Sequence, residues 1–330
     1  MVFRTIPAVP LPVSGICLGT AQYGSQMKEA ESFAQMDRYV ALGGNFLDSA
    51  HIYGAWDRNG ANGGCGNSEV IIGRWMRARG CRDRMVVATK GGHPDFETKA
   101  TGMTRATVLR HLHESLERLQ TGHIDIYWFH RDDRAIPVAE ILGWLEEPVR
   151  QGTIRALGCS HWRIDRLAEA LTLAETSGLP RICASQVAWS LAQAKSTRGQ
   201  GPFGEQLGVD DETRQFHVAR RFPLAAYNSQ ADGFFAAKYD GADFSAPDFP
   251  KPGLYRRYGS ALNFRRRKLA QEMAVSKGRS PNQIALAWLL AQPFPCFAVV
   301  GPRTIEQLED SMGAAEVELS PAEVDALARA

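Results

Sequence analysis

Short apolar runs alternate with amphipathic stretches along almost the whole chain. The apolar runs are rich in Val, Ile, Ala and Cys, a composition typical of buried strands. Eight of them are present, at residues 15–20, 45–48, 85–90, 124–130, 154–160, 182–187, 223–227 and 296–301. Apolar residues at helical spacing fill most of the intervals, at residues 30–42, 68–79, 104–119, 138–151, 163–177 and 281–291.

This alternation of strand and helix predicts a parallel sheet, because parallel neighbours need a crossover helix between them. Eight such units close into a (β/α)8 TIM barrel. We expect one barrel domain over residues 1–330, with long loops at 193–210 and 228–262 that are typical of functional lids. A doubly wound sheet is the alternative. It requires a G-x-G-x-x-G fingerprint after the first strand, and residues 19–24 do not match it.

The charge balance argues against nucleic-acid and membrane partners, and the cysteine spacing argues against disulfides. The chain has 38 Lys and Arg against 36 Asp and Glu, so no bulk charge favours nucleic acid or an anionic membrane. Six cysteines without C-x-x-C spacing favour reduced thiols over a disulfide framework. The sequence shows neither the pattern of a signal peptide nor an apolar run of membrane length. We therefore expect a cytoplasmic protein, and the sequence leaves its oligomeric state open.

Ionisable residues lie at the carboxyl ends of three consecutive predicted strands, where barrels build their sites. Asp48 ends the second strand, with Tyr53 shortly after it, Lys90 ends the third and His130 ends the fourth. Each residue alone has an ordinary structural explanation, as a cap, a packed ring or a solvated charge. Their convergence at one face of a barrel is a rarer coincidence, and it indicates a site.

These four side chains suit the reduction of a carbonyl group. A phenol has a pKa of roughly 10 and donates a proton poorly unless a nearby ammonium stabilises its phenolate. Lys90 could do this for Tyr53 while Asp48 holds the lysine, and His130 could orient the carbonyl. No metal is needed, and only Asp48 and His130 are obvious ligands for one.

Motifs across nearly the full length resemble those of the aldo-keto reductases. The resemblance implies a barrel that binds NADPH without a Rossmann fold, and a catalytic tetrad of Asp48, Tyr53, Lys90 and His130. The motifs are Leu18-Gly19-Thr20, residues 44–54, Asn67-Ser68-Glu69, Ala88-Thr89-Lys90, residues 115–119, residues 125–130, Gly152-Thr153-Ile154-Arg155 and residues 301–308.

The same resemblance implies a cofactor site. Tyr227 would stack on the nicotinamide, and Ser160, His161 and Gln186 would hold its carboxamide. Arg303 and Gln307 would lie at the 2′-phosphate of the adenosine. The planar guanidinium of an arginine can bond two phosphate oxygens at once, so NADPH, which carries this phosphate, is expected over NADH. The whole expected set is Gly19, Thr20, Asp48, Ser160, His161, Gln186, Tyr227, Asn228, Ser229, Gln230, Gly301, Pro302, Arg303, Gln307, Asp310 and Ser311.

The sequence departs from the family pattern in three places. His161 stands where the family usually has Asn, and residues 228–230 read Asn-Ser-Gln instead of Ser-Pro-Leu. Ser311 stands where an Asn often meets the adenine. None of them belongs to the tetrad, so we expect altered cofactor affinity and retained activity.

The expected substrate is a small carbonyl compound. Aromatic rings mixed with hydrogen-bonding groups near the strand ends favour an aldose, a keto-sugar or a related polyol, with a hydrophobic aldehyde or ketone as the alternative. A nicotinamide-binding regulatory subunit that senses redox state is the rival from another class, and the intact tetrad favours the enzyme. The candidate substrate contacts are Gln22, Tyr23, Trp56, Trp128 and Arg131.

Overall fold

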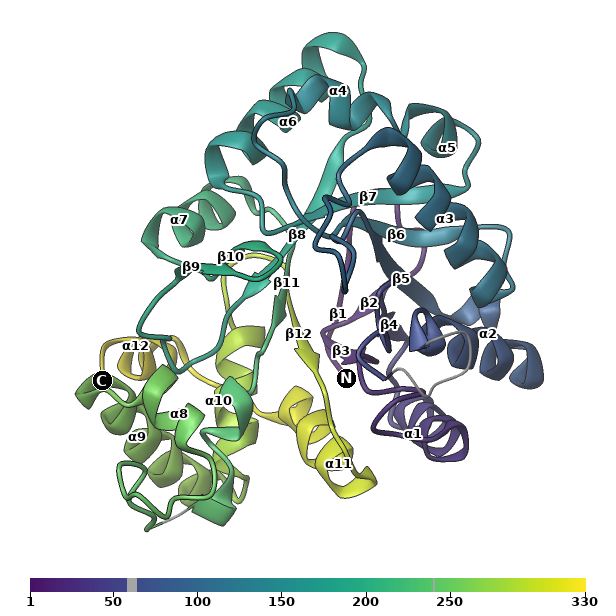
Figure 1. Cartoon of the computed structure of the whole chain (residues 1–330). Helices are drawn as coiled ribbons and strands as arrows, with labels where there is room; N and C mark the ends of the chain where they lie inside the picture. Colours follow the sequence, from purple (N-terminus) through teal and green to yellow (C-terminus); the bar gives the residue numbers. More distant parts are fainter. Residues whose placement is uncertain (58–63, 240) are drawn as a thin grey trace.

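Eight parallel strands close into a barrel surrounded by helices in the computed structural model, which describes residues 1–57, 64–239 and 241–330 (Figure 1). The predicted TIM barrel is confirmed. The strands follow one another around the barrel in the order β11, β12, β3, β4, β5, β6, β7, β8. They are β3 (Ile16–Gly19), β4 (Phe46–Asp48), β5 (Val86–Gly91), β6 (Ile124–Phe129), β7 (Ile154–Ser160), β8 (Ile182–Ala188), β11 (Leu224–Tyr227) and β12 (Cys296–Val300).

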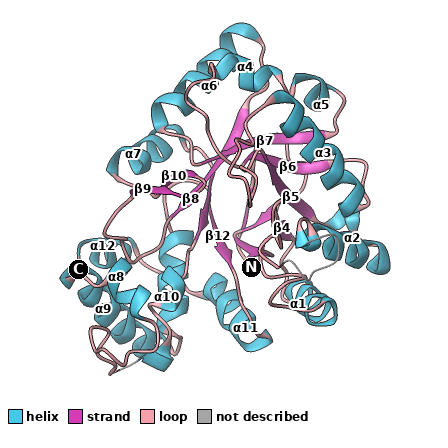
Figure 2. Ribbon diagram, viewed as in Figure 1, coloured by secondary structure: helices cyan, strands magenta, loops and turns pink. Residues whose placement is uncertain are grey.

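Helices cover the outside of the barrel (Figure 2). No helix in the described ranges is long and apolar enough to cross a membrane. The helices between or after the strands are α1 (Glu29–Ala41), α2 (Asn67–Arg79), α3 (Arg105–Leu119), α6 (Ile164–Ser177), α7 (Asp211–Arg220), α10 (Pro281–Leu290), α11 (Ile305–Gly313) and α12 (Pro321–Arg329). Single 3-10 turns lie at Arg82–Arg84 and Ala314–Glu316.

The prediction of a single helix at residues 138–151 is wrong, because the segment forms two short helices, α4 (Val138–Gly143) and α5 (Glu146–Arg150). Pro148 explains the interruption. Its nitrogen carries no hydrogen, so it cannot donate to the carbonyl four residues earlier and is tolerated only in a helix's first turn. The chain therefore restarts a helix at Glu146.

Side chains fill the barrel interior below the strand ends. Phe46 of β4 and Phe297 of β12 meet edge to face, with 5.7 Å between ring centroids. Trp128 of β6 is fully buried in the same cluster, and a side chain on Gly158 of the neighbouring β7 would collide with its indole. The antiparallel pair β1 (Phe3–Arg4) and β2 (Val13–Ser14) belongs to the segment whose apolar side chains close the opposite end. Within the barrel interior, as far as the described residues show it, the layer at the carboxyl ends stays open for a site.

Both segments expected as long loops contain regular structure, which corrects the prediction. Residues 193–210 form a hairpin of β9 (Arg198–Gly201) and β10 (Gly204–Leu207). Residues 228–262 contain two 3-10 turns, Ala231–Gly233 and Ala237–Tyr239, helix α8 (Pro252–Tyr258) and the start of α9 (Ala261–Lys277). Apolar alternation missed the hairpin because most of its residues face solvent, so neither face needs an apolar stripe.

Candidate active site

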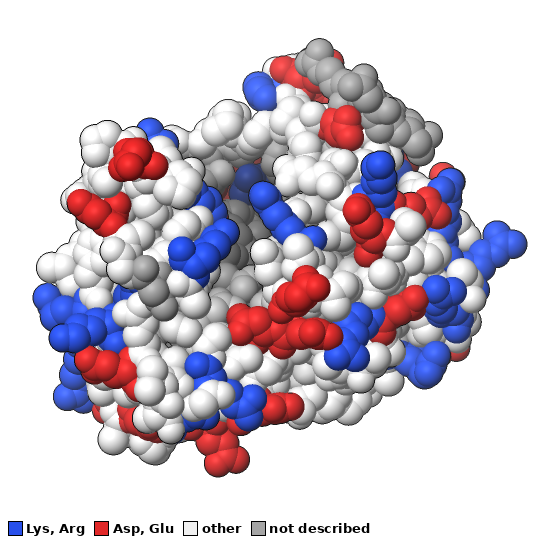
Figure 3. Space-filling model, turned by 90° about the horizontal axis from the view of Figure 1, so that it is seen from below, with Lys and Arg blue, Asp and Glu red and all other residues white. Residues whose placement is uncertain are grey.

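A cavity of about 1080 Å³ opens at the carboxyl ends of the barrel strands. The space-filling view shows the hollow with Lys and Arg side chains beside it (Figure 3). Asp48, Tyr53, Lys90 and His130 all line this cavity, although they come from three different strand ends. The structure thus brings together the four residues that the sequence singled out.

Lys90 lies between Asp48 and Tyr53. Its Nζ donates to Asp48 Oδ2 at 2.5 Å and to the Tyr53 hydroxyl at 3.3 Å, and it also donates to the Ser49 carbonyl oxygen at 2.6 Å. The backbone explains why these groups meet. After β4 the chain continues alongside β5, where the His51 amide donates to the Lys90 carbonyl at 3.0 Å, and then turns Tyr53 back over the lysine.

Burial and charge set the protonation of this pair. Burial lowers the pKa of Lys90, but the Asp48 carboxylate and the Tyr53 oxygen more than offset it, so the pKa is raised and the ammonium persists. Burial also raises the pKa of Tyr53, and the Lys90 charge offsets only part of that rise. Tyr53 is therefore a neutral phenol at pH 7. The lysine supports the phenolate without making it the resting form.

His130 completes the corner as a neutral ring. Its imidazole meets the Tyr53 ring nearly edge-on, with centroids 6.3 Å apart. Burial, with the neighbouring His93 and Arg131, holds the pKa of His130 well below its usual range. Its Nδ1 is buried and finds no hydrogen-bond partner among the described residues. A neutral imidazole carries one N–H, which can donate to a carbonyl oxygen.

Gln186 and Ser160 are hydrogen-bonded to each other, and Gln186 is also bonded to the corner. The name catalytic corner refers here to the four candidate residues Asp48, Tyr53, Lys90 and His130. Gln186 Nε2 donates to Asp48 Oδ1 at 3.0 Å, so the carboxylate is held from both sides. The Ser160 hydroxyl donates to the Gln186 carbonyl oxygen at 2.8 Å. Within the described part of the chain, the Gln186 side-chain oxygen accepts no hydrogen bond. It can accept one from a ligand that carries amide hydrogens.

His161 makes a contact that the sequence did not reveal. Its Nδ1 accepts the Leu207 amide at 2.9 Å, which ties strand β10 of the hairpin to the end of β7. Because Nδ1 accepts, the proton sits on Nε2, which lies 3.5 Å from the Tyr227 hydroxyl. Burial, followed by the charge of Arg131, lowers the pKa of His161 to about 3. The residue has a φ of 59°, a conformation that Asn adopts more readily than His.

The wall beyond Tyr227 contains most of the expected cofactor residues. Arg303 and Gln307 lie at the start of α11, and the Arg303 amide donates to Gln307 Oε1 at 2.9 Å. A side chain added at Gly301 would meet no protein atom within 4 Å, so a ligand can approach this backbone closely. The cavity-lining members of the set are Gly19, Asp48, Ser160, His161, Gln186, Tyr227, Asn228, Ser229, Gln230, Gly301, Arg303, Gln307 and Asp310.

Three other members of the expected cofactor set lie behind the wall. The Thr20 hydroxyl donates to the Asp48 carbonyl oxygen at 3.0 Å, and the Ser311 hydroxyl donates to the Gln307 carbonyl oxygen at 2.7 Å. Pro302 is buried as well. These residues support the segments that line the cavity.

The expected substrate residues separate into two groups. Gln22 and Arg131 line the cavity, and the exposed Trp56 lies 6.1 Å from the Tyr53 ring, measured between centroids. Tyr23 does not line it, because its buried hydroxyl donates to Gln35 of α1 at 2.9 Å. Trp128 points into the barrel core, as described above. Neither Tyr23 nor Trp128 is therefore placed to touch a substrate.

Sequence reasoning missed one wall of the cavity. It is built by the hairpin and by the segment after β11, which had been expected only as loops. Arg257 is paired with Asp232 at 3.3 Å, and Lys251 donates to the Asp232 carbonyl oxygen. The aromatic and proline content of this segment was the signal that it folds against the barrel. The added lining residues include Gln206, Asp232, Lys238, Tyr239, Lys251, Arg257, Ser280 and Asn282.

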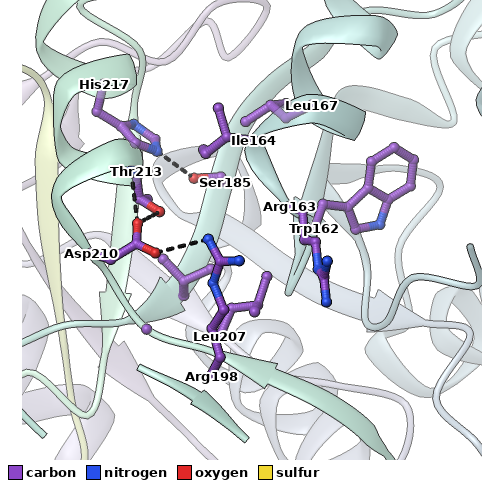
Figure 4. A pocket seen from close by; sticks show the side chains of 12 residues that line it. Trp162, Arg163, Ile164, Leu167, Ser185, Arg198, Leu207, Asp210, Thr213 and His217 are labelled. Atoms are coloured by element: carbon purple, nitrogen blue, oxygen red, sulfur yellow. Dashed lines mark hydrogen bonds and ion pairs between the residues drawn. The ribbon is translucent and has the colours of Figure 1, made fainter. Parts of the chain in front are cut away.

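A second, much smaller cavity lies between the hairpin and helices α6 and α7 (Figure 4). It has a volume of about 20 Å³, which is room for roughly one water molecule. Arg198 pairs with Asp210 at 3.0 Å beside it, and Ser185 lies 3.1 Å from His217. It is too small for a substrate, and these contacts anchor the base of the hairpin.

The large cavity suits NADPH. Tyr227 offers a half-buried ring at one side, Gly301 leaves room at the backbone, and the exposed Arg303 supplies a cation for a phosphate. The donors along this wall are hydroxyls, amides and a guanidinium, which match the phosphates, ribose hydroxyls and carboxamide of a dinucleotide. Within the described residues, no group of three or more His, Cys, Asp or Glu is arranged to hold a metal ion.

Comparisons with known proteins identify the family of this chain. The model of the Aldo/keto reductase family matches residues 15–330. YrpG of Bacillus subtilis, named an uncharacterized oxidoreductase, is 31% identical over 315 residues, which cover 94% of this chain and 89% of that protein. The aldo-keto reductase yakc [NADP(+)] of Schizosaccharomyces pombe is 29% identical over 329 residues, covering 97% of this chain and 87% of that protein.

A solved structure shows the same fold. The thermostable aldo-keto reductase Tm1743, crystallised with the inhibitor epalrestat, matches with a TM-score of 0.72 and 22% identity, covering 99% of both chains. The family match spans nearly the whole chain, and NADP(+) appears in the name of one relative. This chain therefore belongs to the aldo/keto reductase family, as an oxidoreductase that uses NADPH.

Proposed function

We propose that the protein reduces an aldehyde or a ketone, with Tyr53 as the proton donor. The observation that carries the proposal is the position of the Tyr53 hydroxyl at the cavity, 3.3 Å from a Lys90 ammonium that Asp48 holds at 2.5 Å. NADPH, when bound, supplies the hydride for this chemistry. The cavity provides the room and the polar wall that such a cofactor needs.

Tyr53 would give its proton to the carbonyl oxygen as that oxygen gains negative charge. Burial keeps the phenol protonated until then, since it raises the pKa of Tyr53. The remaining phenolate lies beside the Lys90 ammonium, and this ion pair is strong because both groups are buried. Asp48 balances the lysine's charge and fixes its direction. The reverse sequence of proton movements would serve oxidation of an alcohol.

His130 would orient the carbonyl. Because its pKa is held well below the usual range, the ring stays neutral at pH 7 and can donate an N–H to the carbonyl oxygen. A protonated ring would instead compete with Tyr53 as an acid. Burial accounts for the two different roles, because it keeps the histidine neutral and the tyrosine protonated.

The cofactor contacts are proposed in the same terms. Tyr227 would stack on the nicotinamide, and the free side-chain oxygen of Gln186 would accept from its carboxamide. Arg303 and Gln307 would hold the 2′-phosphate, with the Arg303 fork supplying the charge-assisted hydrogen bonds. His161 has only its Nε2–H left for the cofactor, because its Nδ1 is used by the hairpin.

The substrate is proposed to be a polar carbonyl compound, a class that includes sugars and polyols. Gln22, Gln206 and Arg131 line the cavity and offer hydrogen bonds. Aromatic stacking contributes less than the sequence suggested, since Tyr23 and Trp128 lie outside the cavity. A hydrophobic aldehyde or ketone would leave these polar groups without partners, which costs binding free energy.

The direct test is to mix the purified protein with NADPH and a panel of aldehydes and ketones, and to follow the loss of reduced-nicotinamide absorbance. We expect turnover that is faster with hydroxylated or otherwise polar carbonyls than with alkyl ones. Tight NADPH binding without turnover of any carbonyl would contradict the proposal and favour a redox-sensing subunit.

A further inference from the structure

Arg131 is a buried cation at the edge of the proposed reaction centre. It follows His130 directly at the end of β6 and lines the cavity, yet its side chain belongs to a residue only 8% exposed. Its Nε and Nη1 atoms are buried and make no hydrogen bond within the described residues. Such unpaired guanidinium nitrogens are rare, because burial without partners costs free energy.

Among the described residues, no acidic side chain is paired with Arg131. Burial lowers the pKa of Arg131, and the Tyr227 and Tyr53 oxygens offset part of that effect. Asp132, the adjacent residue, is instead paired with Arg166 at 2.8 Å. An arginine stays protonated in proteins, so the cavity keeps a full positive charge among neutral rings.

The position of Arg131 separates it from the expected phosphate sites. Strand β6 lies across the barrel from β12, four strands away in either direction around the closed sheet. The residues expected at the cofactor phosphates, Arg303 and Gln307, follow β12. Arg131 instead lies next to His130, on the side where Tyr53 meets the substrate. Its backbone is fixed there, since Trp162 Nε1 donates to its carbonyl oxygen at 3.3 Å.

We propose that Arg131 binds a carboxylate on the substrate, so that the preferred substrates are aldehydes or ketones carrying a carboxylate group. The inference rests on the carbonyl reductase function proposed above and names its substrate class. A carboxylate in the cavity would supply an acceptor for this guanidinium, and a planar guanidinium can bond both carboxylate oxygens. The interaction would also fix the distance between the carboxylate and the reacting carbonyl.

The kinetic test compares acids with their neutral esters. Succinic semialdehyde and 4-carboxybenzaldehyde are each measured beside their methyl esters, with the wild type and Arg131→Gln. We expect the wild type to favour the acids in kcat/KM by about tenfold or more, the range for hydrogen bonds to charged groups. Arg131→Gln should abolish this preference while the dissociation constant of NADPH changes less than twofold.

The matched control is Arg134→Gln, which removes the same charge from an exposed position of the same loop. This variant should keep the acid-to-ester ratio of the wild type. Equal rates for acids and esters in the wild type would overturn the proposal. So would an equal ratio change in both variants, because it would show a diffuse effect of charge.

A binding measurement keeps the proposal testable even if no carbonyl is turned over. Succinate and succinamide are titrated into the NADPH-loaded protein by calorimetry. We expect succinate to bind about tenfold more tightly than succinamide, and Arg131→Gln to remove the difference. If no carbonyl is turned over but succinate still binds more tightly than succinamide, only the proposed enzymatic function is contradicted. Equal binding of succinate and succinamide would contradict the proposed carboxylate site.

Discussion

The two ends of the cavity are built in different ways. At the catalytic corner, polar groups from strand ends bond to one another, with Lys90, Asp48 and Gln186 in one continuous network. At the cofactor wall, the ends of β11 and β12 carry exposed or half-exposed residues such as Arg303 and Asn228. The positions expected to depart from the family pattern, including His161 and residues 228–230, fall along the wall or behind it.

This difference separates chemistry from binding. A network whose buried groups are hydrogen-bonded to one another keeps its geometry with or without a ligand, so changes there should alter catalysis and stability. A wall of exposed side chains contributes mainly when a ligand arrives, so changes there should alter affinity. The following variants can break or sharpen that distinction.

The largest effect is expected from Lys90→Met. It leaves the Asp48 carboxylate buried without its cation, and removing one partner of a buried pair costs about 3–5 kcal/mol of folding free energy. Turnover should fall by about a thousandfold, within the range for assisted proton transfer. Denaturant unfolding and steady-state kinetics measure the two effects.

A double variant separates them. Adding Asp48→Asn to Lys90→Met removes the orphaned charge, so stability should recover in part while turnover stays lost. If the double variant regained activity, the lysine would be a structural residue only.

The next effect is on the wall. Arg303→Ala should weaken NADPH binding by about 10- to 100-fold, because the charge-assisted bonds to the 2′-phosphate are lost. NADH, which lacks that phosphate, should change by less than about threefold, and kcat at saturating NADPH should be nearly unchanged. Fluorescence titration with both cofactors gives the comparison. An equal loss for both would place the phosphate elsewhere.

A smaller effect is expected where the wall meets the hairpin. His161→Ala leaves the Leu207 amide without its acceptor and should cost about 1–3 kcal/mol of folding free energy. His161→Asn places an amide oxygen near the same donor and suits the left-handed backbone, so it should retain most of the stability and bind NADPH more tightly. Weaker NADPH binding by this variant would mean that the histidine itself contacts the cofactor.

A separate effect is expected in the pH dependence of stability. Burial lowers the pKa of His161 to about 3, so the unfolded chain, with an ordinary histidine pKa near 6.5, binds more protons between these values. Stability contributed by the neutral ring is present above pH of about 6.5 and is lost as the pH falls toward 3. Thermal unfolding of His161→Asn should show a shallower decline across this window than the wild type. Parallel curves would contradict the assignment.

The sequence predicted the barrel and the meeting of Asp48, Tyr53, Lys90 and His130 at one cavity, because both depend mainly on strand boundaries. Once the apolar runs are located, their last residues must meet at one edge of a closed parallel sheet. Asp48, Lys90 and His130 are therefore close whatever the loops do.

Other features depend on depth and contact, which a sequence does not show. Tyr23 and Trp128 follow or end strands like true pocket residues, yet one bonds to a helix and the other fills the core. The hairpin lacks an apolar stripe, so its contact with His161 could not be foreseen. The neutral state of Tyr53 also needed the structure, because burial outweighs the lysine there.

The central claim is that Tyr53 supplies the proton in a cavity whose other end binds the cofactor. Tyr53→Phe tests it most directly, since it removes one hydroxyl and leaves the ring in place. We predict that turnover falls by about a hundredfold or more, while the dissociation constant of NADPH changes less than twofold. Undiminished turnover, or an equal loss of cofactor binding, would contradict the claim.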